Sequence, residues 1–509
     1  MKRWVSVVLL GALFAGCGST VPPTQRTASG QPNSGELGGV APSDSGELGS
    51  TQVTTADGRV ITRGATVPGR TATGSVPRGP SSSSAFGPGV TADKIFIGLA
   101  YPTGNSANAA IGAAGITQGD PKAEDEAVID DINKHGGLAG RKVEGVFHPV
   151  DANSAAPWDV IDQQQCDDWT QDHKIFAALA EPVSDSDTMA GCLDQRGAAL
   201  ISPQLSTSDA ARFRRLPAYI ELISMGLDRA ATAEVSALKA QGWFSGWDSA
   251  SGAPGPTKAK VGIVTYEGAA WAHAVDQTLV PALRAAGYPV SPDDIVRVSR
   301  ESTTSDEAST GAQSSSAVLK LRRDGVSHVI VFDRKAVLTL FFTRAAESQH
   351  YRPRYGLTTQ NGVQALMDGA ALPAAQLAGA KGIGFYPGLD LPTAVSQGAA
   401  YTNDTKKKCL AVMKAHNITF SDANAESVGM NTCSTWWFLR DAINASGGVL
   451  TRAGLLDGIA KLGTSYLTAV NFVNRFSATQ HDGVGAYRYL AFDEGCSCMK
   501  YTSGDIPAP

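Results

Sequence analysis

From about residue 89 onward, continuous apolar runs alternate with segments whose apolar residues recur at helical spacing. The run within KIFIGLAYP, residues 94–102, has the length and continuity of a strand buried on both faces. Residues 121–135 follow an aspartate N-cap, begin with proline and end at two glycines, which predicts a helix. A turn and a second strand at 138–152 complete a strand, helix, strand unit with a right-handed crossover.

The same alternation continues to the C-terminus and predicts an α/β protein. Ligands in parallel sheets bind beyond the carboxyl ends of strands, so three loops are candidates for a site, at 101–106, 181–187 and 204–208. A fresh strand and helix series begins after 218–226, and its polar segment 300–315 is predicted to be a loop. Residues 381–389 read as a crossing back, 424–446 as a long helix, and 474–495 as a closing hairpin.

Three features in this order resemble the type I periplasmic binding proteins. They are the segment DKIFIGLAYPTGN, a helix whose end continues into INKHGGLAGRKVEGVFHPVDAN, and an acidic residue, Asp151, at the end of the second strand. These proteins are the substrate-binding components of branched-chain amino acid type ABC importers. The resemblance runs from about Gly89 to the C-terminus and implies two doubly wound parallel-sheet lobes joined by a three-segment hinge. Lobe 1 is then expected at about 89–220 and 390–475, and lobe 2 at about 221–389 with the C-terminal segment.

Residues 1–17 have a basic start, an apolar centre and small residues before Cys17, which predicts an export signal. Phe14-Ala15-Gly16-Cys17 resembles the bacterial lipobox, so we expect lipidation at Cys17; the alternative is an ordinary secretory signal with an incidental cysteine. Residues 18–88 are dominated by Gly, Ser, Thr and Pro and predict a disordered tether, in which only 57–64 has strand character. The predicted location is the extracytoplasmic face of the bacterial cell membrane, with a lipid anchor.

Composition and motifs exclude several function classes. The hydrophobic content of 42% supports more than one packed unit, and a net charge of -5 without a basic stripe argues against nucleic acid as a partner. The sequence has no Walker loop, GxSxG elbow, HExxH motif or paired CxxC, and its eight histidines are scattered. We therefore expect neither an enzyme, nor a metal site, nor a cofactor.

Candidate ligand-binding residues follow from the family pattern. In relatives, a hydroxyl in the stretch that matches ISPQLST holds the ligand, and EPVSDSD and TYEGAAW match further contact loops. These matches, with the first loop, point to Tyr101, Thr103, Ser184, Ser206, Thr207, Tyr266 and Trp271. The alternative role for each hydroxyl is a turn or helix cap, and for the two second-lobe aromatics it is packing within the lobe.

The charge of the ligand is the point at which this chain departs from the amino acid binders. In those relatives a second-lobe glutamate pairs with the ligand's ammonium, whereas the matching loop here is TTQNG, with neutral Gln360. A buried cation without a counter-charge is costly. Asp333 is a candidate to restore the charge, and Arg334 is instead a candidate to face an anionic ligand. We therefore predict a polar ligand other than a branched-chain amino acid.

Together these features predict a monomeric, lipid-anchored solute-binding protein that captures a small polar ligand and delivers it to an ABC transporter permease. The alternative is a ligand sensor of the same fold that acts through a signalling partner.

The cysteines predict disulfides. Removing Cys17 from the seven leaves an even number in an exported protein. Sequence proximity and predicted lobe favour Cys166 with Cys192, Cys409 with Cys433, and Cys496 with Cys498. The last pair would close a very small ring, so free or metal-bound thiols are its alternative.

Overall fold

The computed structural model describes residues 53–54, 60–61, 86–103, 119–303, 306–334 and 336–509. The chain divides into two compact units, residues 1–80 and 81–509. In the first unit, β1 (Val53–Thr54) and β2 (Val60–Ile61) pair antiparallel, and β2 lies in the stretch with predicted strand character. The remainder of the predicted tether, with Cys17, lies outside the described residues.

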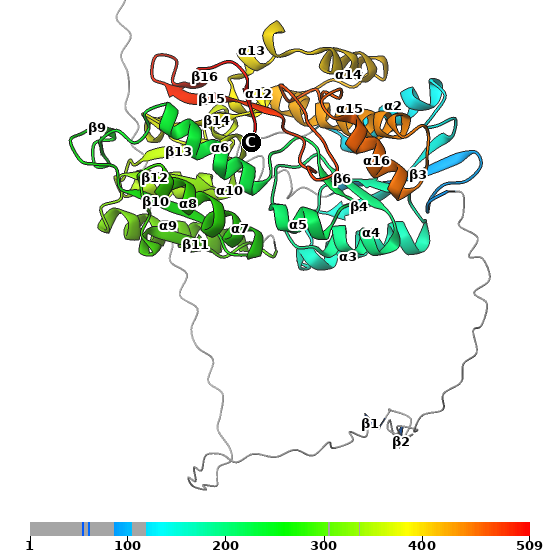
Figure 1. Ribbon diagram of the computed structural model, residues 1–509, viewed down its shortest axis with the longest axis horizontal. Helices are drawn as coiled ribbons and strands as arrows, with labels where there is room; N and C mark the ends of the chain where they lie inside the picture. Colours follow the sequence, from blue (N-terminus) through cyan, green and yellow to red (C-terminus); the bar gives the residue numbers. More distant parts are fainter. Residues whose placement is uncertain (1–52, 55–59, 62–85, 104–118, 304–305, 335) are drawn as a thin grey trace, which may run out of the picture. The chain divides into compact units, whose positions relative to one another are not determined.

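The first lobe of the second unit is built on five parallel strands in the order β4-β3-β5-β6-β7 (Figure 1). They are β3 (Lys94–Thr103), β4 (Lys142–Asp151), β5 (Ala177–Leu179), β6 (Ala199–Ser202) and β7 (Tyr219–Glu221). The expected strand, helix, strand unit is present, with Asp120 capping the helix by accepting from the Ala123 amide. Gly98 lacks a side chain where a Cβ would lie 2.9 Å from the buried Trp169 ring, so this glycine lets the ring reach the sheet.

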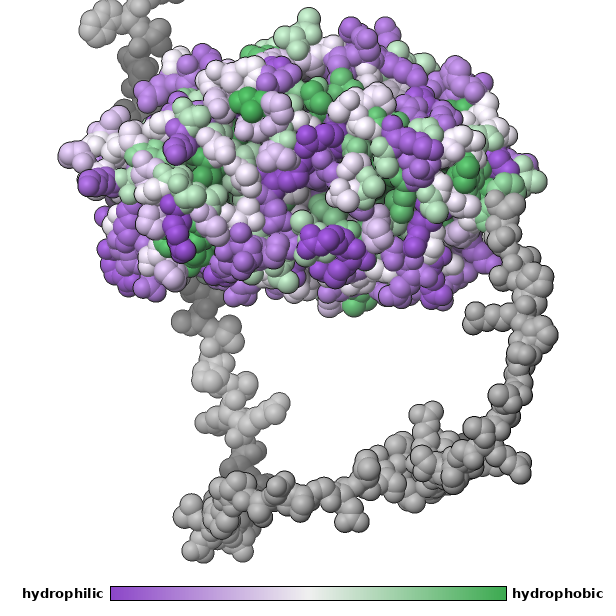
Figure 2. Space-filling model, in the orientation of Figure 1, coloured by the Kyte–Doolittle hydropathy of each residue, from purple (hydrophilic) through white to green (hydrophobic). Residues whose placement is uncertain are grey.

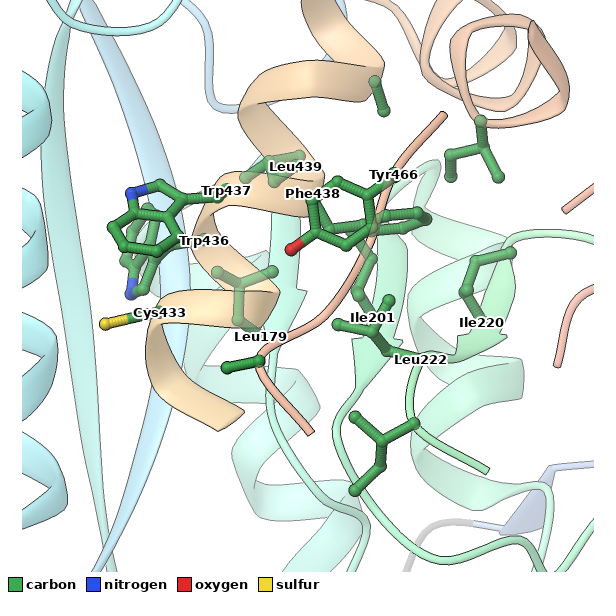
Figure 3. Packing of buried hydrophobic residues seen from close by; sticks show 14 of the residues in the cluster. Leu179, Ile201, Ile220, Leu222, Cys433, Trp436, Trp437, Phe438, Leu439 and Tyr466 are labelled. Atoms are coloured by element: carbon green, nitrogen blue, oxygen red, sulfur yellow. The ribbon is translucent and has the colours of Figure 1, made fainter. Parts of the chain in front are cut away.

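Helices cover both faces of this sheet. They are α2 (Pro121–Lys134), α3 (Trp158–Asp167), α4 (Thr188–Arg196), α5 (Ala210–Arg215), α14 (Asp404–Ala415), α15 (Ala423–Ala445) and α16 (Arg452–Leu462). Strand side chains alternate between the two layers: Leu179 and Ile201 pack with α15, whereas Ala178 and Leu200 pack with α3 and α4. Figure 3 shows the first layer, in which Trp436 and Phe438 of α15 lie near the strands.

The second lobe holds the larger sheet, in the order β11-β10-β12-β13-β14-β15-β16, with β17 beside β15. Pairing is parallel from β11 to β14 and antiparallel for the last strands. The strands are β10 (Val261–Tyr266), β11 (Ile295–Val298), β12 (His328–Phe332), β13 (Arg354–Thr358), β14 (Lys381–Gly384), β15 (Ala486–Asp493), β16 (Cys498–Tyr501) and β17 (Ile506–Pro507). The two central strands, β10 and β12, are buried along their whole length, as expected for a sheet covered on both faces.

Helices and short connections complete the second lobe. The helices are α6 (Leu227–Ala240), α7 (Ala269–Ala274), α8 (Val280–Ala285), α9 (Glu307–Arg323), α10 (Val337–Ser348) and α11 (Val363–Asp368), with α12 (Pro387–Asp390) and α13 (Thr393–Ser396) on the way back to lobe 1. A small hairpin pairs β8 (Trp247–Asp248) with β9 (Ala253–Pro254). The surface face drawn in Figure 2 mixes hydrophilic and hydrophobic residues.

The chain crosses between the lobes three times, at 222–226, 385–386 and 474–485, and we call these segments the hinge. Asn471 ties two of them together, because its side-chain nitrogen donates to the carbonyls of Ile223 and Phe385, both at 3.0 Å. The third crossing pairs with the first through the Val484 amide, which lies 3.1 Å from the Ser224 carbonyl. The predicted fold class, two α/β lobes with a three-segment hinge, is confirmed.

Two local predictions differ from the structure. The loop predicted at 300–315 ends early because α9 begins at Glu307; Ser315 and Ser316 donate to carbonyls four residues earlier, which satisfies their hydroxyls inside the helix. The hairpin predicted at 474–495 forms only an isolated bridge between Asn474 and Val484. Strand β15 pairs instead with β14 and β16, where its apolar face is buried.

The structure forms the three disulfides that the sequence favours. Cys166–Cys192 joins α3 to α4, Cys409–Cys433 joins α14 to α15, and Cys496–Cys498 closes the turn between β15 and β16. Among the described residues, none of the helices has the length and apolar character needed to cross a membrane. The same residues contain no group of three or more His, Cys, Asp or Glu side chains placed to hold a metal ion.

Candidate functional site between the two lobes

Side chains from both lobes meet beyond the carboxyl ends of the parallel strands. Arg334 follows β12 in lobe 2, and its Nε lies 2.9 Å from Oδ2 of Asp185, in the loop after β5 of lobe 1. Both side chains are buried, at 6% and 5% exposed. A second contact between the lobes joins the Trp158 amide to the Ser302 carbonyl at 2.9 Å. This edge of the two sheets is where ligands bind in doubly wound folds.

Arg334 is surrounded by acids and aromatic rings. Its Nη2 lies 3.5 Å from Oε2 of Glu301, and its guanidinium carbon lies 5.9 Å and 5.6 Å from the ring centres of Trp158 and Tyr266. Burial by itself would lower the pKa of Arg334, but the carboxylates of Asp185 and Glu301 outweigh it and raise the pKa. Arg334 therefore remains a cation at the meeting point of the lobes.

Asp333, the neighbouring residue, is held by its own lobe. Its Oδ1 accepts from the Tyr266 hydroxyl at 3.2 Å and from the Arg334 amide at 2.6 Å, and its Oδ2 accepts from the Thr339 amide at 2.7 Å. Burial raises the pKa of Asp333 to about 6, although these donors oppose the shift. Because both oxygens accept hydrogen bonds from the start of α10 and from β10, Asp333 fixes the loop that carries Arg334.

Tyr266 and Trp271 are brought together with Asp333, as part of lobe 2. Their rings are 5.4 Å apart in an edge-to-face arrangement, and Trp271 also packs edge-to-face on Phe332 at 5.7 Å. Burial and the nearby acid Asp333 raise the pKa of the Tyr266 hydroxyl, so it stays protonated and donates. Trp271 is 1% exposed, and its packing against Tyr266 holds that ring in place.

Gln360 lies in the adjacent loop of lobe 2. Its carbonyl accepts from the Ala336 amide at 3.1 Å, which places the TTQNG loop alongside the Asp333–Arg334 loop. Asn361 reinforces this contact by donating to Thr339 Oγ1 at 2.8 Å. The Gln360 side chain is 2% exposed, and its Oε1 has no hydrogen-bond partner among the described residues. A buried amide oxygen of this kind is available to a donor.

On the lobe 1 side, the loop after β5 is fixed by buried Asp162 of α3. Oδ2 of Asp162 accepts from the Ser184 hydroxyl at 2.7 Å and from the Ser184 amide at 3.0 Å. Oδ1 accepts from the Val183 amide at 2.8 Å. The Ser184 hydroxyl therefore holds the loop, and Asp185, the next residue, is the one that reaches lobe 2.

The loop after β6 is held in the same way. The Ser206 hydroxyl accepts from the Ser208 amide at 3.2 Å, and Thr207 Oγ1 accepts from Arg212 Nη1 at 3.1 Å. Arg212 also donates through Nε to Asp187 at 2.9 Å, so this buried guanidinium ties the two lobe 1 loops to each other. Both hydroxyls therefore make hydrogen bonds within lobe 1, Ser206 inside its own loop and Thr207 to Arg212.

Tyr101 and Thr103 lie at the end of β3. The Tyr101 ring packs edge-to-face on Phe147 at 6.3 Å and under the Lys122 ammonium at 5.3 Å, and the Thr103 hydroxyl donates to the Val150 carbonyl at 3.3 Å. These contacts lie within lobe 1. Residues 104–106, the rest of the predicted loop, lie outside the described residues.

The sequence did not point to Trp158, Asp185 or Glu301 as site residues. It offered Arg334 as a candidate to face an anionic ligand, but did not predict its contacts with the other lobe. Asp185 could have been proposed as a site residue, because it lies in the EPVSDSD loop next to the candidate hydroxyl of Ser184. Its partner could not be found from the sequence, since the two residues belong to different lobes and no local spacing links them.

Comparisons with known proteins support the fold. No protein-family model and no curated protein sequence matches this chain. A solute-binding protein of an ABC transporter from R. palustris, solved with 4-hydroxybenzoate, is similar in structure with a TM-score of 0.55 at 13% identity, over 82% of this chain and 98% of that one. A leucine-binding protein from Thermotoga maritima MSB8 gives a TM-score of 0.53 at 15% identity, over 82% and 99%. A fatty acid ABC transporter substrate-binding protein from Thermomonospora curvata gives 0.51 at 16% identity, over 83% and 95%.

The described geometry defines a two-lobed α/β protein with a hinge, in which the two lobes meet at Arg334 and Asp185 beyond the carboxyl ends of parallel strands. This fold is the type I periplasmic binding protein fold, as the sequence resemblance implied.

Proposed function

We propose that the protein is an extracytoplasmic solute-binding protein that encloses a small polar ligand between its lobes and delivers it to an ABC importer. The observation that supports this most directly is the contact of Arg334 of lobe 2 with Asp185 and Trp158 of lobe 1. We call this site between the lobes the cleft. The hinge of three segments permits the lobes to rotate, and the interlobe contacts give the closed arrangement a specific geometry. The neighbours from R. palustris and Thermomonospora curvata are substrate-binding proteins of ABC transporters.

The charges in the cleft support a ligand other than leucine, isoleucine or valine. Gln360 offers an amide oxygen instead of the carboxylate that amino acid binders of this family place in the matching loop. Asp333 does not replace it, because both of its oxygens already accept hydrogen bonds from lobe 2. The other lobe 2 acid here, Glu301, is also engaged, by Thr310 and Arg334. The ammonium of an α-amino acid would therefore meet the cation Arg334 and no free lobe 2 carboxylate, which is unfavourable.

We further propose that the ligand presents an acceptor group, such as a carboxylate or hydroxyl, to Arg334 and lies against the rings of Trp158 and Tyr266. Ser184, Ser206 and Thr207 would contribute from lobe 1 through their hydroxyl oxygens, each of which has more than one lone pair to accept a hydrogen bond. Gln360 Oε1 would accept a donor from the ligand. Trp271 would contribute by supporting Tyr266.

A thermal-shift screen followed by calorimetry tests this proposal, with branched-chain amino acids and aromatic and aliphatic carboxylates in one panel. We expect saturable stabilisation by a carboxylate and none by leucine. Arg334→Met should abolish it, whereas Arg300→Met, which removes a more exposed arginine near the same aspartate, should retain most of it. Tight binding of leucine, isoleucine or valine would refute the ligand class and leave solute binding intact.

The proposed location is the extracytoplasmic membrane surface, with the folded unit carried on a tether attached at lipidated Cys17. Changing Cys17→Ser should move the protein from the membrane fraction to the soluble extracytoplasmic fraction. Mass spectrometry of the N-terminal peptide provides the control. If the native protein is found in the soluble fraction with Cys17 intact and unmodified, the proposed lipid anchor is wrong.

A further inference from the structure

A cavity of about 200 Å³ lies on the hinge side of the folded unit, and we call it the hinge pocket. Its walls come from the second crossing and α12, from α14, α15 and the loop 467–472 of lobe 1, and from β15 of lobe 2. In Figure 1, α12, α15 and β15 lie at the top, whereas α5 and α7 lie at the bottom. Arg334, Asp185, Trp158 and Tyr266 do not line it. The hinge pocket is therefore separate from the proposed cleft.

Arg488 of β15 supplies one cation to the pocket. Its Nε donates to Asp505 Oδ1 at 2.6 Å, and its guanidinium carbon lies 4.0 Å from the centre of the Phe472 ring. Within the part of the chain that the structure describes, its terminal nitrogens Nη1 and Nη2 have no hydrogen-bond partner. A guanidinium whose terminal nitrogens are free is suited to bind a carboxylate with two parallel hydrogen bonds.

Lys406, in the first turn of α14, supplies a second cation from the opposite lobe. Its Nζ lies 2.8 Å from Glu426 Oε1, and its side chain is 9% exposed. An ammonium has three donors, so this ion pair leaves capacity for another acceptor. Each of the two cations that line the pocket has one carboxylate partner, Asp505 for Arg488 and Glu426 for Lys406. The donors that these pairs leave unused favour an occupant with a strong acceptor group.

The rest of the lining combines an apolar and aromatic wall with polar side chains, which are those of Ser396, Thr402, Asn403, Ser427 and Asn471. Met430 of α15 is buried, as are Ala469 and Val470 of the loop after α16, and the rings of Tyr386 and Tyr401 contribute flat surfaces. Such a wall suits a small ring or short hydrocarbon body that carries a single acidic group.

We propose that the hinge pocket binds a small aromatic carboxylate, with the carboxylate at Arg488 and Lys406 and the ring against the apolar wall. Because Arg488 belongs to lobe 2 and Lys406 to lobe 1, a rotation of the lobes changes the distance between the two cations. Asn471, which also lines the pocket, bonds to two hinge crossings. An occupant therefore favours one lobe arrangement over others and couples this site to the cleft.

Fluorine NMR with 4-fluorobenzoate tests the proposal, and the neutral isostere 4-fluorobenzamide is the matched control for charge. We expect a saturable bound signal for the acid, with the amide at least about tenfold weaker because a charge-assisted hydrogen bond is lost. Ala400→Trp places a large side chain at an exposed lining position and should remove the signal. Arg488→Gln should weaken binding by at least about tenfold, and Arg488→Lys should restore part of it.

The cleft variant Arg334→Met separates this site from the proposed function. A bound signal should remain in Arg334→Met, because none of the pocket residues is changed, although its affinity should shift with the lobe arrangement. This result is expected even if no ligand for the cleft is found. Absence of a bound signal in the native chain, equal binding of acid and amide, or a signal that survives Ala400→Trp and is lost in Arg334→Met would each overturn the proposal.

Discussion

Replacing Arg334 with methionine should open the lobes without unfolding them. The change removes a buried cation and leaves Asp185 and Glu301 buried without it, and breaking a buried ion pair in this way costs about 3 to 5 kcal/mol. Asp185 and Arg334 belong to different lobes, so rotation that exposes the acids to water relieves much of this cost. The substitution should therefore raise the free energy of the closed arrangement more than that of the open one.

The size of this penalty sets the expected change in the ratio of closed to open protein. A penalty of about 4 kcal/mol lowers the ratio of closed to open protein by roughly a thousandfold. Small-angle X-ray scattering should show a larger radius of gyration, and urea unfolding should show a much smaller change in the free energy of unfolding than the penalty itself. Ligand affinity should fall with the closed population.

Arg300→Met is the matched control. Arg300 Nη1 lies 3.6 Å from the same Asp185 oxygen, but its side chain is 33% exposed, so its loss should cost less than about 1 kcal/mol. Equal effects of the two variants, or an unchanged radius of gyration together with a loss of several kcal/mol in unfolding free energy for Arg334→Met, would refute the interpretation.

Three further predictions concern stability. Replacing both Cys166 and Cys192 with serine should lower the free energy of unfolding by about 3 kcal/mol, because the bond closes a loop of 26 residues; unchanged denaturation would contradict this. Burial raises the pKa of Glu234 to about 8, so the folded state holds a proton that the unfolded state releases above about pH 4.5, and stability should fall as pH rises between these values. Glu234→Met should remove this fall, about 1.4 kcal/mol per pH unit at its steepest, in urea titrations at several pH values. Asn471→Ala should cost about 2 to 4 kcal/mol, since it leaves two buried hinge carbonyls without a donor; a midpoint like that of the native chain would argue against the tie between crossings.

The sequence determined the local elements and the fold class. Continuous apolar runs such as the one in β3 favour strands covered on both faces. Asp120 and Pro121 mark the start of α2, and the two glycines after it mark its end. The disulfide pairs also followed from spacing, because each joins neighbouring elements of one lobe or one turn. Where local rules failed, at α9, tertiary packing of Val318 and Leu321 stabilised a helix that its serine-rich sequence does not favour.

The tertiary structure alone decided which polar residues meet. Ser184 and Asp185 are adjacent in one loop, yet the serine bonds to Asp162 behind it and the aspartate pairs with Arg334 of the other lobe. Likewise, Asp333 and Arg334 are adjacent, yet their side chains have different partners. Asp333 accepts a hydrogen bond from the start of α10 in its own lobe, whereas Arg334 pairs with Asp185 of the other lobe. Such pairings depend on how the hinge positions two separately folded sheets, and that information is not contained in any short stretch of sequence.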